Sequence, residues 1–129
     1  MGDMPTQGGT LARFAGEKYL NLETFRRSGV GVPTPMWFSE EGGVLYLSAP
    51  SHTGKVKRIR NDARVRVVPR DSRGVAKGEW LAARAAFVTG EQAARTDHLL
   101  AKKYGLQRRM LDLWGKLKRW EYTIIAIRL

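Results

Sequence analysis

The sequence is built from short runs of alternating apolar residues, each closed by a turn signal. In the run over residues 19–27, every second position would point to one face of a strand: Leu20, Leu22, Thr24 and Arg26. The turn pair Ser28-Gly29 closes this run. Comparable runs occupy residues 31–38, 44–49, 64–69, 79–89 and 122–129. The pattern predicts about six short strands joined mostly by tight turns.

The second run, residues 31–38, carries prolines at positions 33 and 35. Proline lacks the N–H that a central strand must donate, so it is confined to sheet edges and irregular segments. We therefore expect this strand at an edge of the sheet. Residues 40–43 follow as a hairpin turn that leads into the third strand.

Helical periodicity is confined to the start of the chain and to two connections. A short helix is expected over residues 11–19, with inward positions at Leu11, Phe14, Ala15 and Tyr19. A second helix begins near Lys55 and would bury Val56, Ile59 and Ala63.

Two further helices are expected after Gly90, separated at Gly105. The first would bury a face made of Ala94, His98, Leu99 and Tyr104. The second carries an apolar stripe of Leu106, Met110, Leu113, Trp114 and Leu117. The cations beside this stripe would suit a membrane surface, but we expect the stripe to dock the helix onto the core.

Short antiparallel strands with helices only in the connections favour a mainly β (α+β) domain, a small barrel with peripheral helices. The length indicates one domain, residues 1–129, with a flexible start over residues 1–10. Such a barrel fills its interior with side chains, so a ligand must bind on its surface or between subunits. The sequence has neither a signal-peptide pattern nor a run of about 20 apolar residues, which favours a cytoplasmic protein with no membrane partner.

The composition excludes several kinds of chemistry. There is no cysteine, which rules out disulfides, thiol catalysis and thiolate metal sites. The two histidines, His52 and His98, are far apart in sequence, so no metal site is expected. No nucleophile–base set and no paired carboxylates stand out, and no catalytic residue is assigned. This absence suits an enzyme whose cofactor carries the chemistry.

A formal net charge of +11 indicates an anionic partner. Cations are densest over residues 55–73, which begin at a loop-to-helix junction, where free backbone N–H groups favour anions. Thr53, Gly54 and Lys55 would form a compact phosphate cradle there, and a solvated helix face is the alternative. The triplet is not a Walker loop, because it lacks the glycine-rich lead and a hydroxyl residue after the lysine.

Three stretches together resemble a known family: Val32-Pro33-Thr34-Pro35-Met36-Trp37-Phe38, Gly43-Val44-Leu45-Tyr46-Leu47, and residues 53–65 from Thr53-Gly54-Lys55 to Arg64-Val65. In order and spacing they resemble the pyridoxamine 5′-phosphate oxidase-like split-barrel superfamily. The chain is similar in particular to its actinobacterial branch of flavin- and deazaflavin-dependent oxidoreductases, many of which use coenzyme F420. The resemblance covers roughly residues 15–129. It implies a six-stranded antiparallel split β-barrel, the FMN-binding split barrel, that forms a homodimer.

The resemblance also implies a cofactor site. Thr53, where such proteins often have serine, and Lys55 would contact the cofactor phosphate, while Lys57 and Arg58 would line the same anionic path. The other implied contacts are the backbone of Thr34, Pro35, Met36 and Trp37 at the ring system, Ser48 and Ser51 beside the ribityl chain, and Val68 near the ring. In a homodimer the partner subunit would complete each site, with Trp80 or Arg84 as candidates.

These observations predict a reductase that transfers hydride from reduced F420 to a small organic electrophile, with FMN as the alternative cofactor. A non-catalytic protein that carries F420 or a flavin is the second hypothesis, because a fold alone does not decide function. Nucleic-acid binding is a remote alternative, since residues 60–73 contain no aromatic side chain that could stack on bases.

Overall fold

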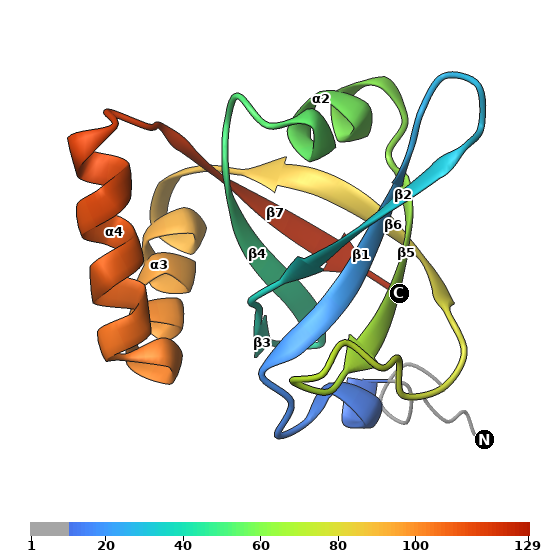
Figure 1. The fold of residues 1–129 in the computed structure, drawn as a ribbon, viewed down its shortest axis with the longest axis horizontal. Coiled ribbons are helices and arrows are strands. Elements are labelled where there is room, and N and C mark those ends of the chain that lie inside the picture. The colour runs from blue at the N-terminus through green and yellow to red at the C-terminus, as the bar shows by residue number, and fades with distance from the viewer. Residues whose placement is uncertain (1–10) are drawn as a thin grey trace.

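The computed structural model describes residues 11–129, so the expectation for residues 1–10 lies outside the described part of the chain. Within this part, seven antiparallel strands form one curled sheet in the order β2-β1-β5-β6-β7-β4-β3 (Figure 1). The strands are β1 (Tyr19–Phe25), β2 (Gly31–Met36), β3 (Ser39–Glu41), β4 (Val44–Pro50), β5 (Arg64–Arg70), β6 (Leu81–Val88) and β7 (Tyr122–Arg128). The helices are the 3-10 turn η1 (Ala12–Phe14) and the α-helices α2 (Gly54–Asn61), α3 (Gly90–Tyr104) and α4 (Leu106–Leu117).

The two edge strands, β2 and β3, follow each other directly in sequence. Only Trp37 and Phe38 separate them, yet they lie at opposite ends of the sheet order and do not pair with each other. The sheet is therefore open between them, as in a split barrel. The strand count differs from the expected six because β3 forms where we expected part of a turn. β3 pairs with the start of β4, and the turn shrinks to Gly42 and Gly43, both with positive φ.

The position of β2 at an edge of the sheet is confirmed. Pro33 pairs with Glu23 and Pro35 with Asn21, both on β1. The missing proline donors are tolerated because the described sheet has no strand on the other side of β2.

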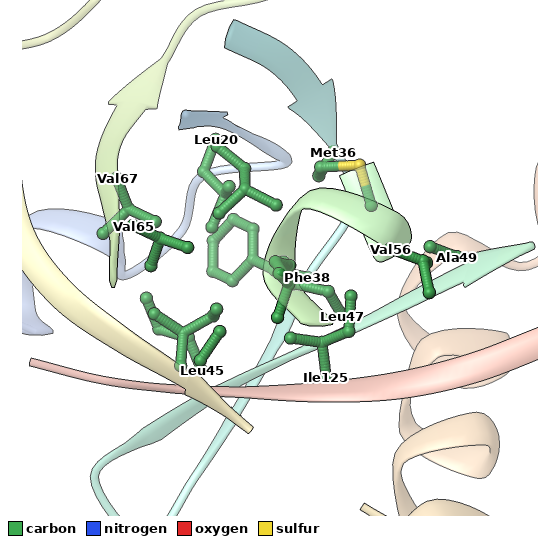
Figure 2. Close-up of a cluster of buried hydrophobic side chains, with 14 of the residues drawn as sticks. Leu20, Met36, Phe38, Leu45, Leu47, Ala49, Val56, Val65, Val67 and Ile125 are labelled. Carbon is green, nitrogen blue, oxygen red and sulfur yellow. The ribbon is translucent and has the colours of Figure 1, made fainter. Parts of the chain in front are cut away.

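Alternating strand residues fill the interior of the sheet (Figure 2). The strand side chains that are at most 2% exposed there belong to Leu20, Leu22, Leu45, Leu47, Ala49, Val65, Val67, Ile125 and Ile127. α2 adds Val56 and Ile59, and η1 adds Phe14. A buried aliphatic side chain of this size contributes about 1.5–3 kcal/mol relative to an exposed one. The interior is thus occupied by side chains, as expected, and a ligand site has to lie outside it.

The prediction of a helix over residues 11–19 is wrong, because only the three-residue η1 forms there. Gly16 adopts a φ of +77°, which ends the turn before β1 begins. Phe14 is buried as expected and meets Phe38 edge-on, with ring centroids 5.9 Å apart, whereas Ala15 is exposed.

α3 packs against the outer face of the sheet, over β3 and β4 (Figure 1). Its buried residues, four apart, are Thr96, Leu100 and Tyr104. The face that we expected is therefore partly wrong, since Ala94 and His98 are exposed. The face that is buried contains a threonine among its apolar residues. The apolar period alone therefore predicted a different face of the helix.

α4 lies on α3 and turns its small and charged residues inward. A Cβ at Gly115 would overlap the hydroxyl oxygen of Tyr122, so glycine allows this close approach. Arg108 is buried between Asp97 and Asp112, at 2.5 and 2.7 Å. Docking of the apolar stripe onto the core is therefore a wrong prediction. Its members are between 52% and 71% exposed: Leu106, Met110, Leu113, Trp114 and Leu117.

Candidate functional site

The expected phosphate cradle lies where β4 leads into α2. The Thr53 hydroxyl donates to the carbonyl oxygen of Pro50 at 2.8 Å, which folds the loop back on itself. The Ser51 hydroxyl lies 2.6 Å from the Thr123 hydroxyl of β7. Because a threonine hydroxyl has one proton, Thr53 would donate to a phosphate only after releasing Pro50. The backbone N–H groups of the first turn of α2 remain available.

Lys55 and Arg58 lie three residues apart on one side of α2. Lys55 is partly buried, and this burial lowers the pKa of its ammonium group. The positive charge of Arg58 lowers the Lys55 pKa further. Within residues 11–129 the Lys55 side chain has neither a hydrogen bond nor an ion pair. The structure thus holds two cations close together with no acid between them.

The guanidinium of Arg58 is held in place by β1. Its Nε donates to Oγ1 of Thr24 at 2.7 Å. Gly54 allows the guanidinium to lie over the first turn of α2, because a Cβ there would be 2.7 Å from a guanidinium nitrogen. Burial lowers the pKa of Arg58, and the positive charge of Arg26 lowers it further. Arg58 therefore links the start of α2 to the far end of β1.

Sequence reasoning missed Thr24 and Arg26 as members of this site. Both belong to the alternating face of residues 19–27, after the apolar positions 20 and 22. The available signal was a threonine on an otherwise apolar face, since a buried polar side chain needs a hydrogen-bond partner. Thr24 is fully buried and accepts from Arg58. Only the packing of α2 against β1 shows which residue they meet.

Lys57 lies apart from this cluster. A step of about 100° per residue puts it nearly opposite Lys55 around the helix axis. Its side chain is exposed. The structure therefore brings together Lys55 and Arg58 of the expected anionic path, and not Lys57.

The segment expected at the ring system is divided between three environments. Thr34 and Pro35 lie on the open edge of the sheet, and Thr34 pairs with Leu22 of β1. The Met36 side chain belongs to the core, in the same cluster as Val56 (Figure 2). The Trp37 indole stacks on Tyr104 of α3. Pro35 is exposed and Thr34 and Trp37 are partly exposed, so these three residues, and not Met36, are open to a ligand in the single chain.

Ser48 and Val68 point away from the core and are covered. Ser48 shares the outer face of β4 with Tyr46, and its buried hydroxyl has no hydrogen-bond partner in the described part of the chain. Val68 is fully buried, so it offers no surface to a ring in this conformation. Trp80 is partly buried, with the Arg66 guanidinium 5.5 Å from its ring centroid, and Arg84 is exposed. Their role across a dimer interface stays a prediction.

Two other kinds of feature, a metal site and a membrane-spanning helix, concern residues 11–129. No group of three or more histidine, aspartate or glutamate side chains is arranged to hold a metal ion there. None of the helices in the same range has the length and apolar character of a membrane-spanning segment.

No protein-family model and no curated protein matches this chain, but solved structures do. HutZ, the heme storage protein from Vibrio cholerae, aligns with a TM-score of 0.71 at 13% identity, over 97% of this chain and 90% of HutZ. A putative pyridoxamine 5′-phosphate oxidase from Listeria innocua aligns with a TM-score of 0.60 at 15% identity, over 95% and 92% of the two chains. A NimC/NimA family protein from Clostridium acetobutylicum aligns with a TM-score of 0.60 at 11% identity, over 93% and 78%.

At sequence identities this low, the structural alignments establish the fold only. The activity has to be inferred from the site. The matches cover nearly the whole chain, whose curled sheet is open between β2 and β3. The chain therefore has a split-barrel fold, similar to that of the putative pyridoxamine 5′-phosphate oxidase and the NimC/NimA family protein.

Proposed function

We propose that this chain is an oxidoreductase that binds a deazaflavin or flavin cofactor and holds the cofactor phosphate with Lys55 and Arg58. The observation that carries the proposal is this pair of cations, whose pKa values are both lowered and to which no carboxylate contributes. Like charges that are partly removed from water repel each other, and a bound anion offsets that repulsion. A phosphate here would also meet the free N–H groups at the start of α2.

F420 is the cofactor that we favour, with FMN as the alternative. F420 carries a phosphodiester and a γ-linked glutamate tail, so it presents several negative charges in a row. The cations extend in the same way, from Lys55 through Arg58 to Arg26. FMN, with a single terminal phosphate, would use only the start of this row.

The cofactor, when bound, supplies the hydride chemistry. The chain would bind and orient it: Lys55 and Arg58 at the phosphate, with Thr24 fixing the guanidinium. The open edge of β2 lies one strand beyond Thr24, because Thr24 pairs with Val32. Backbone groups near Thr34 would therefore approach the ring system, and a small organic electrophile would bind on the exposed side of the ring.

We also propose that two copies form the functional unit, each completing the other's site. The outer face of β6 supports this, because Ala82, Arg84 and Ala86 are exposed there. Small side chains on a sheet allow a second sheet to approach closely, and Arg84 would then reach towards the partner's cofactor. Light scattering measures the assembly, and a monomer that binds cofactor with full affinity would contradict this part.

A carrier without turnover is the second candidate. It is favoured by the likeness to HutZ, which is described as a heme storage protein, and by the absence of an assigned proton donor. A carrier would bind cofactor tightly and leave quinones, enones and nitroaromatic compounds unreduced. A reductase would reduce at least one of these classes with reduced F420.

Fluorescence titration with F420 and with FMN tests the proposal. We expect saturable F420 binding that Lys55→Ala weakens by about tenfold or more, since a hydrogen bond to a charged group contributes about 1.5–3 kcal/mol. Lys57→Ala is the matched control, because it removes an equal charge from the other side of α2, and its affinity should stay within about twofold. The assignment would be overturned if the protein bound neither cofactor, or if Lys55→Ala and Lys57→Ala lost the same cofactor affinity.

A further inference from the structure

The apolar stripe of α4 contains five of the ten large apolar side chains that are exposed within residues 11–129. Its five side chains lie on one side of the helix, at spacings of three and four residues. Their exposed fractions are 71% for Leu106, 67% for Met110, 60% for Leu113, 52% for Trp114 and 71% for Leu117. Apolar side chains that gather in this way on a surface mark an interaction site.

The outward direction of the stripe is set by contacts on the opposite side of α4. Gly115 lies against Tyr122, where only a glycine fits without displacing the phenol. Arg108 is bound by Asp112 on α4 and Asp97 on α3. Turning the stripe inward would break these ion pairs and place Arg108 in solvent. The exposed stripe is therefore a stable property of this packing.

Cations border the stripe. Arg109, Lys116, Lys118 and Arg119 are exposed, and the Lys118 ammonium lies 4.9 Å from the centroid of the Trp114 ring. The one acidic residue of α4, Asp112, is already paired with Arg108. The border therefore carries a net positive charge next to an aromatic side chain. This combination is typical of a helix that lies in the plane of a membrane interface.

A groove at the α3–α4 junction continues this surface. It has a volume of about 620 Å³ and is lined by Lys102, Arg109, Leu106 and His98, among others. Two cations thus converge on a hollow beside the first apolar residue of the stripe. An anionic headgroup in the groove would leave its acyl chains next to Leu106.

We propose that α4 docks this protein onto an anionic membrane surface, with its apolar stripe in the interface and lipid headgroups at the bordering cations. A second copy of α4 is a poorer occupant, because two such faces would bring cationic borders together. The sequence-based expectation of no membrane partner assumed that the stripe was needed for packing, and the structure removes that assumption. The proposal does not depend on the bound cofactor.

Vesicle co-sedimentation tests the proposal on the full chain. The vesicles are phosphatidylcholine alone, and phosphatidylcholine with about one third phosphatidylglycerol. We expect binding to the anionic vesicles only, decreasing as salt is raised. The double variant Leu113→Gln/Leu117→Gln should bind about tenfold or more weakly, because burial of each leucine is lost. The variant Lys116→Glu/Lys118→Glu should also bind weakly.

The controls use residues of the same kind elsewhere on the surface. Val30→Gln/Val75→Gln removes two side chains that are 57% and 59% exposed, and it should bind like the wild type. Unchanged thermal unfolding of all variants shows that the fold is intact. Absence of binding to anionic vesicles would overturn the proposal. So would a wild-type dimer that Leu113→Gln/Leu117→Gln converts to monomers, since a second copy would then cover the stripe.

Discussion

Trp37 and Tyr104 stack face to face, with ring centroids 4.5 Å apart and an interplanar angle of 6°. Trp37 belongs to the short crossing between the two edge strands, and Tyr104 is the last residue of α3. The Tyr104 hydroxyl accepts from the N–H of Phe38 at 3.0 Å and lies 2.7 Å from the carbonyl oxygen of Lys18. One tyrosine thus ties the open seam of the barrel to the start of β1.

Removal of the Tyr104 hydroxyl should destabilise the seam. Tyr104→Phe keeps the stacking on Trp37 but leaves the buried N–H of Phe38 without its acceptor. A buried group that loses its partner costs about 1–3 kcal/mol, so the free energy of unfolding should fall by that amount. Chemical denaturation measures it. A loss below about 0.3 kcal/mol would show that water replaces the hydroxyl.

Thr24 should act on cofactor binding through Arg58 rather than by direct contact. Thr24→Val keeps the shape of the side chain and removes the oxygen that accepts from the Arg58 Nε. We expect F420 affinity to fall by about three- to tenfold, in line with one lost hydrogen bond. Thr24→Ser restores the acceptor and should restore the affinity. Equal affinities for the valine and serine variants would contradict this positioning role.

Small anions should stabilise the protein through Lys55. Phosphate or sulfate that binds between Lys55 and Arg58 in the folded state alone must raise the midpoint of thermal unfolding. The rise should be smaller in Lys55→Ala and unchanged in Lys57→Ala. Differential scanning fluorimetry at constant ionic strength, with chloride as the reference anion, measures the difference. Identical shifts in the three proteins would argue against an anion site at Lys55.

Lys103 should make stability depend on pH in the alkaline range. Burial lowers the pKa of its ammonium group from 10.5 to about 8, while its Nζ lies 3.6 Å from the Phe38 ring centroid. Between these two values the unfolded chain binds more protons than the folded one, so the Lys103 contribution to stability rises with pH. Tyr104, whose pKa is raised to about 12, acts in the opposite direction above pH 10.

The measurement is the difference in unfolding free energy between about pH 7.5 and pH 9.5. Wild type should gain stability over this interval relative to Lys103→Met, which has no titrating group at this position. Lys102→Met, at an exposed neighbour, should keep the wild-type pH dependence. If the unfolding free energy of wild type and of Lys103→Met changed equally with pH, the lowered pKa of Lys103 would be contradicted.

Features that depend on neighbouring residues could be predicted from the sequence. Alternation over two positions predicted the strands, and Pro33 and Pro35 predicted an edge because a missing N–H is a property of the residue. The spacing of Val56, Ile59 and Ala63 predicted a buried helical face after β4. Val56 and Ile59 are buried, whereas Ala63 lies beyond the end of α2 and is partly exposed. The basic loop-to-helix junction pointed to a cradle of Thr53, Gly54 and Lys55, whereas Arg58 was implied, together with Lys57, by the family resemblance.

Which faces pack against each other could not be predicted in this way, because it depends on the tertiary structure. A period of 3.6 residues shows that α4 has an apolar stripe, but not that Gly115 and Arg108 are the side that packs. Alternation shows that Thr24 and Arg26 share a face, but not that Arg58 lies across from it. Contacts between residues far apart in sequence depend on shape and charge from several elements at once, and no local pattern contains that information.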